Sequence, residues 1–515
     1  MSWREEADRI RARREAATAQ GGPEGVEKQH QKGRLTIRER IDAVLDPGSF
    51  DEVGRTAGDA EVGANEELLS FDPANFVLGF GTVGGRPVVV GGEDFTLRGG
   101  SPTLAGLRKS VYAESLALES RIPLIRLHEG SGGSVGTPKR PTPPSAVFDA
   151  PRFRSVAETL AAVPVASAAL GAVAGLPAAR LVSSHFSVMS KSTAQILVAG
   201  PAVVQRAMGE NLSKEDLGGA QVHAKNGTVD NAAEDEAGCF ADIRTFLGYL
   251  PSNVWELPPV QPCDDPLDRA DDALVDIVPR ERRRAFDMRR LIGHVVDQGS
   301  FFEMGRGYGR SQITGLARLD GRPVGLWAND GRFLAGSMTA DGAQKARRFL
   351  ELCETFHLPV VSLIDEPGFW IGSQAEKEAT IRHGSNVVLT AAMMSVPWAS
   401  VMIRRSFGVA QAAHYGPGGY VLAWPSAETG PLPVEGGVAI AYRREIEAAP
   451  DPEARRRELE EQMAAKQSPF PRAEAFAIHD LIDPRETRPM LCRWLARQGP
   501  KLATLLGPPR FLPRP

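Results

Sequence analysis

The chain has 515 residues, enough for two or more separate cores, and its 60 basic and 64 acidic residues leave a net charge of −4. No long basic run is present, so we expect no nucleic-acid partner. The four scattered cysteines, nine histidines without metal-ligand spacing and charged N-terminus without an apolar signal region predict a soluble cytoplasmic protein with no metal site.

Two helices are predicted at the start of the chain. Residues 1–33 are polar and charged, which indicates a helical extension that ends in a turn. Residues 34–50 have the pattern of a short amphipathic helix stopped by Pro47 and Gly48.

Strands and helices then alternate in two series. The first series is strand 87–91, helix 102–119 with Ser101 as its N-cap, strand 123–127, helix 151–162 and strand 163–170. The second series is strand 323–328, helix 340–356, strand 359–364, helix 375–395 and strand 397–403. This alternation predicts an α/β fold, in which ligands usually bind at the loops after the strands.

One uncharged stretch, residues 160–179, is long enough to cross a bilayer. It contains Pro164 and Pro177 and is mostly Ala, Gly and Val. We therefore predict a buried strand followed by a tight loop, and no association with a membrane.

The later part of the chain carries a boundary and a charged helix. Residues 251–266 contain five prolines, as expected of a linker. Residues 451–465 place acidic residues first and basic ones later, a charge order that suits the helix dipole.

A long internal duplication is the most informative feature. Gly85-Arg86-Pro87 recurs as Gly321-Arg322-Pro323, 236 positions later, and further matches follow at the same offset. After a short deletion the offset becomes 233, and Gly175 then matches Gly408. A constant offset predicts two copies of one domain with two similar half-sites. The predicted divisions are an extension (1–33), a first domain (34–255), a linker (256–275) and a second domain (276–515).

The usual catalytic motifs are missing from the sequence. We find no nucleophile elbow, phosphate-binding loop, dinucleotide fingerprint or biotin attachment site. Glycine-rich loops at strand ends remain, and their exposed N–H groups can hold a developing oxyanion, each donor being worth roughly 3–4 kcal/mol. For any single loop, a tight turn is the better explanation of its glycines. Because such loops occur at matching positions in both repeats, we favour a functional role for them.

Glu366 and His414 each lie near one of these loops. They suggest an acid/base pair, although a lone Glu or His in such a loop is more often structural.

The sequence resembles the carboxyltransferase β subunits of biotin-dependent acyl-CoA carboxylases, the propionyl-CoA and methylcrotonoyl-CoA carboxylase group. The resemblance extends over nearly the whole chain, from Gly33 to Arg488. The stretches that carry it include Asp94-Phe95-Thr96, Gly99-Gly100-Ser101, Leu217-Gly218-Gly219-Ala220, Tyr249-Leu250-Pro251-Ser252-Asn253, Pro367-Gly368-Phe369, Ile381-Arg382-His383-Gly384 and Ala423-Trp424-Pro425.

The resemblance implies two crotonase-like ββα-spiral domains and a carboxyl transfer. The carboxyl group of carboxybiotin, carried by a partner protein, passes to an acyl-CoA through a thioester enolate. The first domain is expected to bind the acyl-CoA and the second to bind biotin. The implied partners are a biotin carboxylase and a biotin carrier, and the implied assembly is a hexamer built from dimers.

The resemblance also implies the roles of particular residues. The thioester oxyanion hole is expected at Gly175 and Leu176, and the biotin-side hole at Gly408, Val409 and Ala410. Other residues expected at the acyl-CoA are Gly99, Gly100, Ser101, Gly132, Gly133, Gln411 and Ala412. The biotin side is expected to be lined by Pro367, Gly368, Phe369, Arg382, His383 and Gly384.

This chain departs from the family pattern in both hole loops. The common Gly-Gly-Ala is replaced by Gly175-Leu176-Pro177 and by Gly408-Val409-Ala410. We expect the Leu and Val side chains to resist positive φ and to crowd the cleft. Gln411-Ala412 stands where Tyr-Asp is common, which indicates an unusual acyl substrate. Two alternatives stay open: a biotin-independent acyl-CoA decarboxylase, and a non-catalytic subunit of a carboxylase complex.

Overall fold

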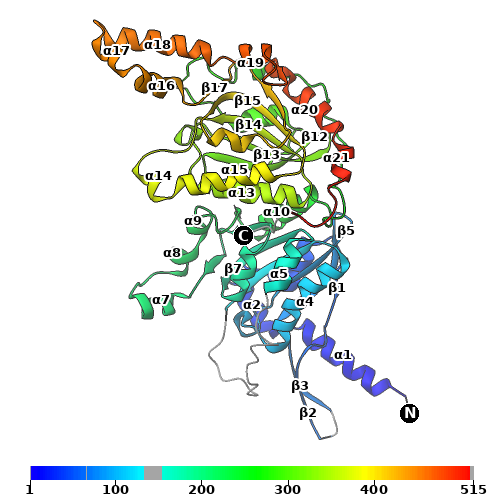
Figure 1. The fold of residues 1–515 in the computed structure, drawn as a ribbon. Helices are drawn as coiled ribbons and strands as arrows, with labels where there is room; N and C mark the ends of the chain where they lie inside the picture. The colour runs from blue at the N-terminus through cyan, green and yellow to red at the C-terminus, as the bar shows by residue number, and fades with distance from the viewer. Residues whose placement is uncertain (1, 65–66, 133–152, 283, 511–515) are drawn as a thin grey trace. The chain divides into compact units, whose positions relative to one another are not determined.

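The computed structural model describes residues 2–64, 67–132, 153–282 and 284–510. The chain forms two compact units, which meet in sequence between Glu256 and Leu257 (Figure 1). We call them unit 1 and unit 2.

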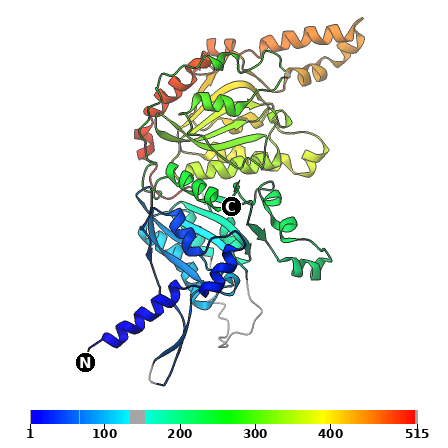
Figure 2. The same ribbon diagram turned by 180° about the vertical axis from the view of Figure 1, so that it is seen from behind.

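Unit 1 contains one large sheet, a small hairpin and helices around them. Its strands are β1 (Asp51–Glu52), β2 (Gly58–Val62), β3 (Leu68–Pro73), β4 (Phe76–Val83), β5 (Arg86–Glu93), β6 (Leu124–Gly130), β7 (Val165–Ala174), β8 (Phe186–Ser190), β9 (Gln195–Leu197) and β10 (Asn231–Ala233). Its helices are α1 (Arg4–Thr18), α2 (Gly22–His30), α3 (Ile37–Val44), η1 (Arg98–Gly100), α4 (Leu104–Ser120), α5 (Phe153–Leu160), α6 (Leu176–Val182), α7 (Pro201–Met208), α8 (Lys214–Gly218), α9 (Ala220–His223) and α10 (Glu236–Tyr249). Helix α1 and the β2–β3 hairpin extend away from the large sheet in both views (Figure 1, Figure 2).

Unit 2 repeats this plan. Its strands are β11 (Phe302–Met304), β12 (Gln312–Leu319), β13 (Arg322–Asn329), β14 (Val360–Glu366), β15 (Trp398–Phe407), β16 (Tyr420–Ala423), β17 (Glu428–Gly430) and β18 (Asp480–Leu481). Its helices are α11 (Ala273–Asp276), α12 (Met288–Val295), η2 (Leu334–Gly336), α13 (Ala340–Thr355), α14 (Ser373–Lys377), α15 (Thr380–Met393), η3 (Ala410–His414), α16 (Val434–Ala441), α17 (Arg443–Ala448), α18 (Pro452–Lys466), α19 (Phe470–Glu474), η4 (Pro484–Glu486), α20 (Thr487–Ala496) and α21 (Gly499–Ala503).

The two large sheets have the same topology, which confirms the predicted duplication. Their strand orders are β1-β4-β5-β6-β7-β8-β10 and β11-β12-β13-β14-β15-β16-β18, and β9 and β17 pair with β7 and β15. In each sheet the first three strands are antiparallel and the later pairs are parallel. Even the irregularities recur, since the register shifts at His128/Gly130 in unit 1 and at Ile364/Glu366 in unit 2. The carboxyl ends of the parallel strands therefore lie at corresponding places in both units.

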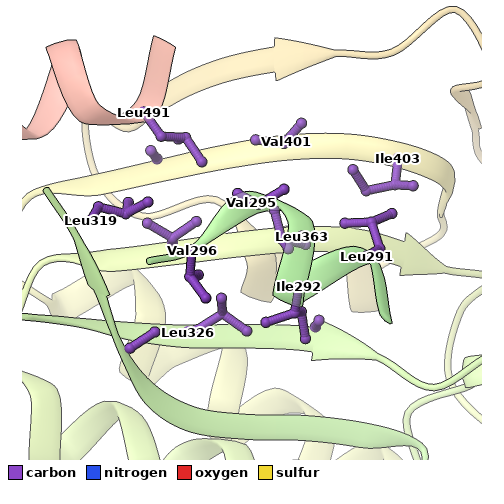
Figure 3. Packing of buried hydrophobic residues seen from close by; sticks show 14 of the residues in the cluster. Leu291, Ile292, Val295, Val296, Leu319, Leu326, Leu363, Val401, Ile403 and Leu491 are labelled. Atoms are coloured by element: carbon purple, nitrogen blue, oxygen red, sulfur yellow. The ribbon is translucent and has the colours of Figure 1, made fainter. Parts of the chain in front are cut away.

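The core of unit 2 lies between its sheet and two helices, α12 and α20 (Figure 3). The apolar residues of α12 recur at helical spacing, so Leu291, Ile292 and Val295 face the sheet together. Figure 3 shows them against Leu363 and Val401 on the central strands. This packing fixes β14 and β15, whose ends carry the predicted biotin-side residues.

Several predicted boundaries were wrong. The helix expected from residue 102 begins at Leu104, because Thr103 rather than Ser101 is the N-cap and accepts from the Gly106 N–H at 3.1 Å. The helix expected over 375–395 is two helices, because Ala379 adopts a left-handed conformation with φ 53°.

The strand predicted within residues 160–179 is confirmed as β7, but the loop predicted after it is shorter than expected because β7 continues to Ala174 and only Gly175 separates it from α6. No helix in the described parts of the chain combines the length and the apolar character that a bilayer span requires.

Residues 257–275 are fixed to unit 2 along much of their length. The Gln261 N–H donates to the Gly321 carbonyl at 3.0 Å, and the Arg318 guanidinium donates to the Pro259 carbonyl at 3.0 Å. The buried Arg488 guanidinium also donates to the carbonyl of Pro266. The proline-rich segment therefore lies along the surface of unit 2.

Candidate functional site

In unit 1, the predicted acyl-CoA residues Gly99, Gly100 and Ser101 lie beside the end of β6. Gly99 and Gly100 have φ of 61° and 68°, so their turn needs glycine-like conformations. The Ser131 N–H donates to the Gly99 carbonyl at 3.1 Å, and the Ser101 and Ser131 hydroxyls are 2.9 Å apart. The η1 turn and the loop after β6 are thus bonded to each other.

Gly132 and Gly175, two of the predicted acyl-CoA-side residues, lie against each other. A Cβ built on Gly132 would lie only 2.7 Å from the Gly175 Cα, so the two backbones pack with no room for a side chain. Gly175 has φ 65° and directs the chain into α6. The N–H of Leu176 makes no hydrogen bond within the described chain and can donate to a ligand. Gly133 lies outside the described residues.

A small pocket lies behind this loop and has polar groups that the sequence analysis missed. Gly100 and Leu176 are among its lining residues, together with the buried Glu93 and Arg180. The Glu93 carboxylate is 3.1 Å from Nδ1 of His128. Burial opposes ionisation of Glu93, but His128 outweighs it and holds the pKa of Glu93 below its usual value.

In unit 2, the predicted biotin-side segments also meet. A Cβ on Gly384 would lie 2.3 Å from the Phe369 ring, so this glycine lets α15 pack directly on Phe369. Arg382 and His383 precede Gly384 in the first turns of α15 and are exposed and half-buried. Gly368 has φ 126°, and a Cβ on it would lie 3.9 Å from the Phe407 carbonyl oxygen. The turn after β14 therefore lies beside the end of β15.

The second hole loop differs from the expectation in two respects. The Gly408 N–H donates to the Gly430 carbonyl at 3.2 Å, whereas the N–H groups of Val409 and Ala410 have no hydrogen bond among the residues described. Val409 has φ −71°, and the positive φ of 64° is confined to Gly408. The strain expected at Val409 is therefore absent, although its side chain is 63% exposed beside the loop.

A cavity of about 330 Å³ lies at the carboxyl ends of β13, β14 and β15. Pro367 and Phe407 line it, and so do three arginines that the sequence analysis did not select: Arg282, Arg404 and Arg405. Its other lining residues are Ala285, Gly331, Ala335, Glu428 and Pro433.

The arginine pair is held by a buried carboxylate. Asp365 accepts from Arg404 at 2.9 Å and from Arg405 at 2.7 Å. Burial favours the neutral acid, but Arg405 and Arg404 outweigh it and hold the pKa of Asp365 below its usual value. Arg282 pairs with Glu428. Each cationic group of the cavity wall thus has a fixed anionic partner.

Gln411 and Ala412, predicted to face an acyl group, belong to unit 2. The Gln411 Oε1 accepts from the Ser406 hydroxyl at 2.9 Å, which fixes its side chain against the end of β15. Ala412 is exposed.

Glu366 and His414 do lie together, with His414 Nε2 3.5 Å from Glu366 Oε2. Both side chains are fully buried, and burial raises the pKa of Glu366. Neither is among the residues that line the cavity. The pair is therefore placed behind the site rather than in it.

Among the described residues, no group of His, Cys, Asp and Glu side chains could hold a metal ion. Backbone N–H groups without a hydrogen bond among the described residues follow a strand end in each unit, at Leu176 and at Val409.

Comparison with known proteins agrees with this arrangement. The family model of the carboxyl transferase domain matches residues 28–504. One relative is the carboxyltransferase subunit of propionyl-CoA carboxylase from Haloferax mediterranei, 35% identical over 497 residues that cover 95% of each chain. Another is the alpha subunit of methylmalonyl-CoA decarboxylase from Veillonella parvula, 31% identical and covering 94% of each chain.

A comparison with a solved structure supports the same fold and family. The crystal structure of the transcarboxylase 12S hexamer, with methylmalonyl-CoA bound, superposes with a TM-score of 0.86 at 29% identity, covering 97% of this chain and 96% of that one. The predicted pair of crotonase-like domains is confirmed. The chain belongs to the carboxyl transferase domain family.

Proposed function

We propose that this chain is the carboxyltransferase subunit of a biotin-dependent acyl-CoA carboxylase. The observation that carries the proposal is the matched pair of strand-end loops. Each has a positive-φ glycine, Gly175 or Gly408, followed by a backbone N–H that makes no hydrogen bond within the described chain. Two such donors suit two carbonyl oxygens that each become anionic during one transfer.

Unit 1 is the proposed acyl-CoA side. The Leu176 N–H donates to the thioester oxygen as the enolate forms. The close packing of Gly132 on Gly175 fixes the backbone just before this donor. The small pocket behind Leu176 has Glu93 and Arg180 in its wall together with apolar residues such as Phe76 and Pro177.

Unit 2 is the proposed biotin side. When bound, carboxybiotin supplies the carboxyl group as CO2, and its ring nitrogen accepts the proton from the acyl-CoA. The residues present suit such a ring: Phe407, which precedes the loop, lines the cavity at the ends of β13–β15, and the Val409 N–H makes no hydrogen bond within the described chain. The Gly408 N–H is occupied by Gly430 and Ala410 is fully buried, so we assign donation to the ureido oxygen to Val409.

The partners proposed are a biotin carboxylase and a biotin carrier, with the chain assembled as a dimer-built hexamer in the cytoplasm. The hexamer described for transcarboxylase 12S, whose chain this one matches over 97% of its length, supports the assembly.

A second candidate function is decarboxylation of an acyl-CoA. The resemblance to the Veillonella methylmalonyl-CoA decarboxylase subunit favours it, and it uses the same thioester hole. A non-catalytic subunit remains the third alternative.

One assay separates the three functions. The purified chain is incubated with methylmalonyl-CoA, with and without free biotin, and loss of the carboxyl group is followed. Loss that depends on biotin is the expected result. Equal loss without biotin supports the decarboxylase, and no loss in either mixture, combined with stable binding to a biotin carboxylase, rejects catalysis.

A further inference from the structure

Two buried side chains, Glu366 and His414, lie next to each other between the two loops of the biotin-side site, without a hydrogen bond between them. Glu366 ends β14 and is followed by the Pro367–Phe369 turn, whereas His414 ends η3, which begins at Ala410. His414 Nε2 is 3.5 Å from Glu366 Oε2, and both side chains are fully buried. No water or substrate reaches either group, so neither can act as an acid or base toward a ligand.

Glu366 holds the turn that follows it. Its Oε1 accepts from the Gly368 N–H at 2.9 Å. Its Oε2 accepts from Asn329 at 3.0 Å and from Gln312 at 3.4 Å. The turn is thereby tied, through one carboxylate, to β12 and β13.

His414 holds the other loop. Its ring stacks on Trp327 with 3.9 Å between centroids, and its Nδ1 is 2.8 Å from the Ser362 hydroxyl. Its backbone carbonyl accepts from Trp398 at 2.9 Å and from Ser400 at 2.8 Å. The chain that carries the Val409 and Ala410 N–H groups is therefore anchored at its far end on β13, β14 and β15.

The duplication shows that the fold does not need this pair. At the offsets of 236 and 233, the positions of Glu366 and His414 correspond to Gly130 and Leu181 in unit 1. Gly130 has no side chain, and Leu181 is part of an apolar cluster. The same strands and the same register shift form in unit 1 without a Glu–His contact at these two positions, since the buried Glu93–His128 pair of unit 1 lies elsewhere, on β5 and β6. The pair is a property of the unit whose site is proposed to take biotin.

We propose that Glu366 and His414 are positioning residues that hold the Pro367–Phe369 turn and the Gly408–Ala410 loop at a fixed separation, so that the neighbouring cavity, which Pro367 and Phe407 line, keeps the shape that a ureido ring requires. This proposal rests on the proposed function for its ligand. The coupling between the loops is a property of the protein alone and is testable without substrate.

The first test measures backbone hydrogen exchange by mass spectrometry in the free protein. His414→Phe keeps a ring against Trp327 but removes both nitrogens, and Glu366→Gln keeps the shape but loses an acceptor for its donors. Each variant is expected to exchange at least tenfold faster in the opposite loop: residues 366–369 for His414→Phe, and 408–414 for Glu366→Gln. Ile292→Val, in the apolar core of the same unit, is the control for general loss of stability and is expected to change neither loop selectively.

The second test uses biotin-dependent loss of the carboxyl group from methylmalonyl-CoA. Both variants are expected to raise KM for free biotin at least fivefold while KM for the acyl-CoA stays within twofold. Unchanged exchange in the opposite loop overturns the proposal, and so does faster exchange with an unchanged KM for biotin. A wild-type protein that shows no biotin-dependent turnover rejects the proposed function instead, and the exchange experiment still decides whether the pair couples the loops.

Discussion

At the scale of single residues, each unit contains a buried carboxylate, and the two units neutralise it with arginines from different parts of the chain. Each half buries a carboxylate at the register shift of its sheet, Glu129 in unit 1 and Asp365 in unit 2. Asp365 is neutralised by Arg404 and Arg405 from the neighbouring strand. A buried carboxylate requires such partners, because removing it from water without them is costly.

In unit 1 the arginines that neutralise Glu129 do not come from the neighbouring strand. Gly171 occupies the position that corresponds to Arg404, and a Cβ there would lie 2.3 Å from the Glu129 carboxyl carbon. The guanidiniums are supplied by Arg34 at 2.9 Å and Arg40 at 2.7 Å, both near the N-terminus. No local pattern connects these positions, so the sequence could not predict this network.

Replacement of Asp365 by Asn tests the buried ion pairs. It leaves Arg404 and Arg405 without their anion, so the free energy of unfolding at pH 7 should fall by about 3–5 kcal/mol. Because the folded pKa of Asp365 is lowered, its contribution is present above its unfolded pKa of about 3.9 and is lost as pH falls toward the folded pKa. Denaturant unfolding from pH 7 to pH 3 should therefore show a smaller difference between Asp365→Asn and wild type at the acid end. A constant difference across this range would contradict the assignment.

At the scale of elements, periodicity predicted the three central strands of each sheet and the helices between them, but neither the strands that begin each sheet nor the later parallel strands. In β4, Gly79 and Gly81 interrupt the apolar run. A Cβ on Gly79 would lie 2.3 Å from the Asp51 carbonyl, so the glycine is required by the close approach of β1. Glycine inside a strand weakens the sequence signal for that strand. The break between α14 and α15 at Ala379 likewise has no Gly or Pro from which it could be predicted.

Two helix glycines of unit 2 provide a matched test of α15. Gly384→Ala places a methyl group against Phe369, whereas Gly293→Ala in α12 meets nothing within 4 Å. Ala favours a helix over Gly by about 1 kcal/mol, so Gly293→Ala should raise Tm slightly and leave turnover unchanged. Gly384→Ala should lower biotin-dependent turnover about tenfold, because Phe369 must move away from the helix. Equal turnover in the two variants, measured by carboxyl loss from methylmalonyl-CoA, would show that α15 does not shape the site.

At the scale of the whole molecule, the duplication was the strongest prediction. The constant offset identified the two repeated domains, and the motifs identified the family. The match of Gly175 with Gly408 was predicted, but the restriction of positive φ in these loops to the two glycines was not, since the sequence analysis expected the strain at Leu176 and Val409. The cavity arginines and the Glu366–His414 contact were not, since they depend on which side chains from distant strands meet.

We propose that each unit holds one of the two substrates. The most direct measurement is a set of initial rates for Gly132→Ala and Gly408→Ala, with methylmalonyl-CoA and free biotin varied in turn. The controls are Gly200→Ala and Gly418→Ala, whose new methyl groups would meet no atom within 4 Å. Gly418 has the same positive φ as Gly408, 64°, so it also controls for backbone strain. We predict that Gly132→Ala raises KM for the acyl-CoA alone, that Gly408→Ala raises KM for biotin alone, and that neither control changes either value. If both site variants raise the same KM, the division of substrates between the units is wrong.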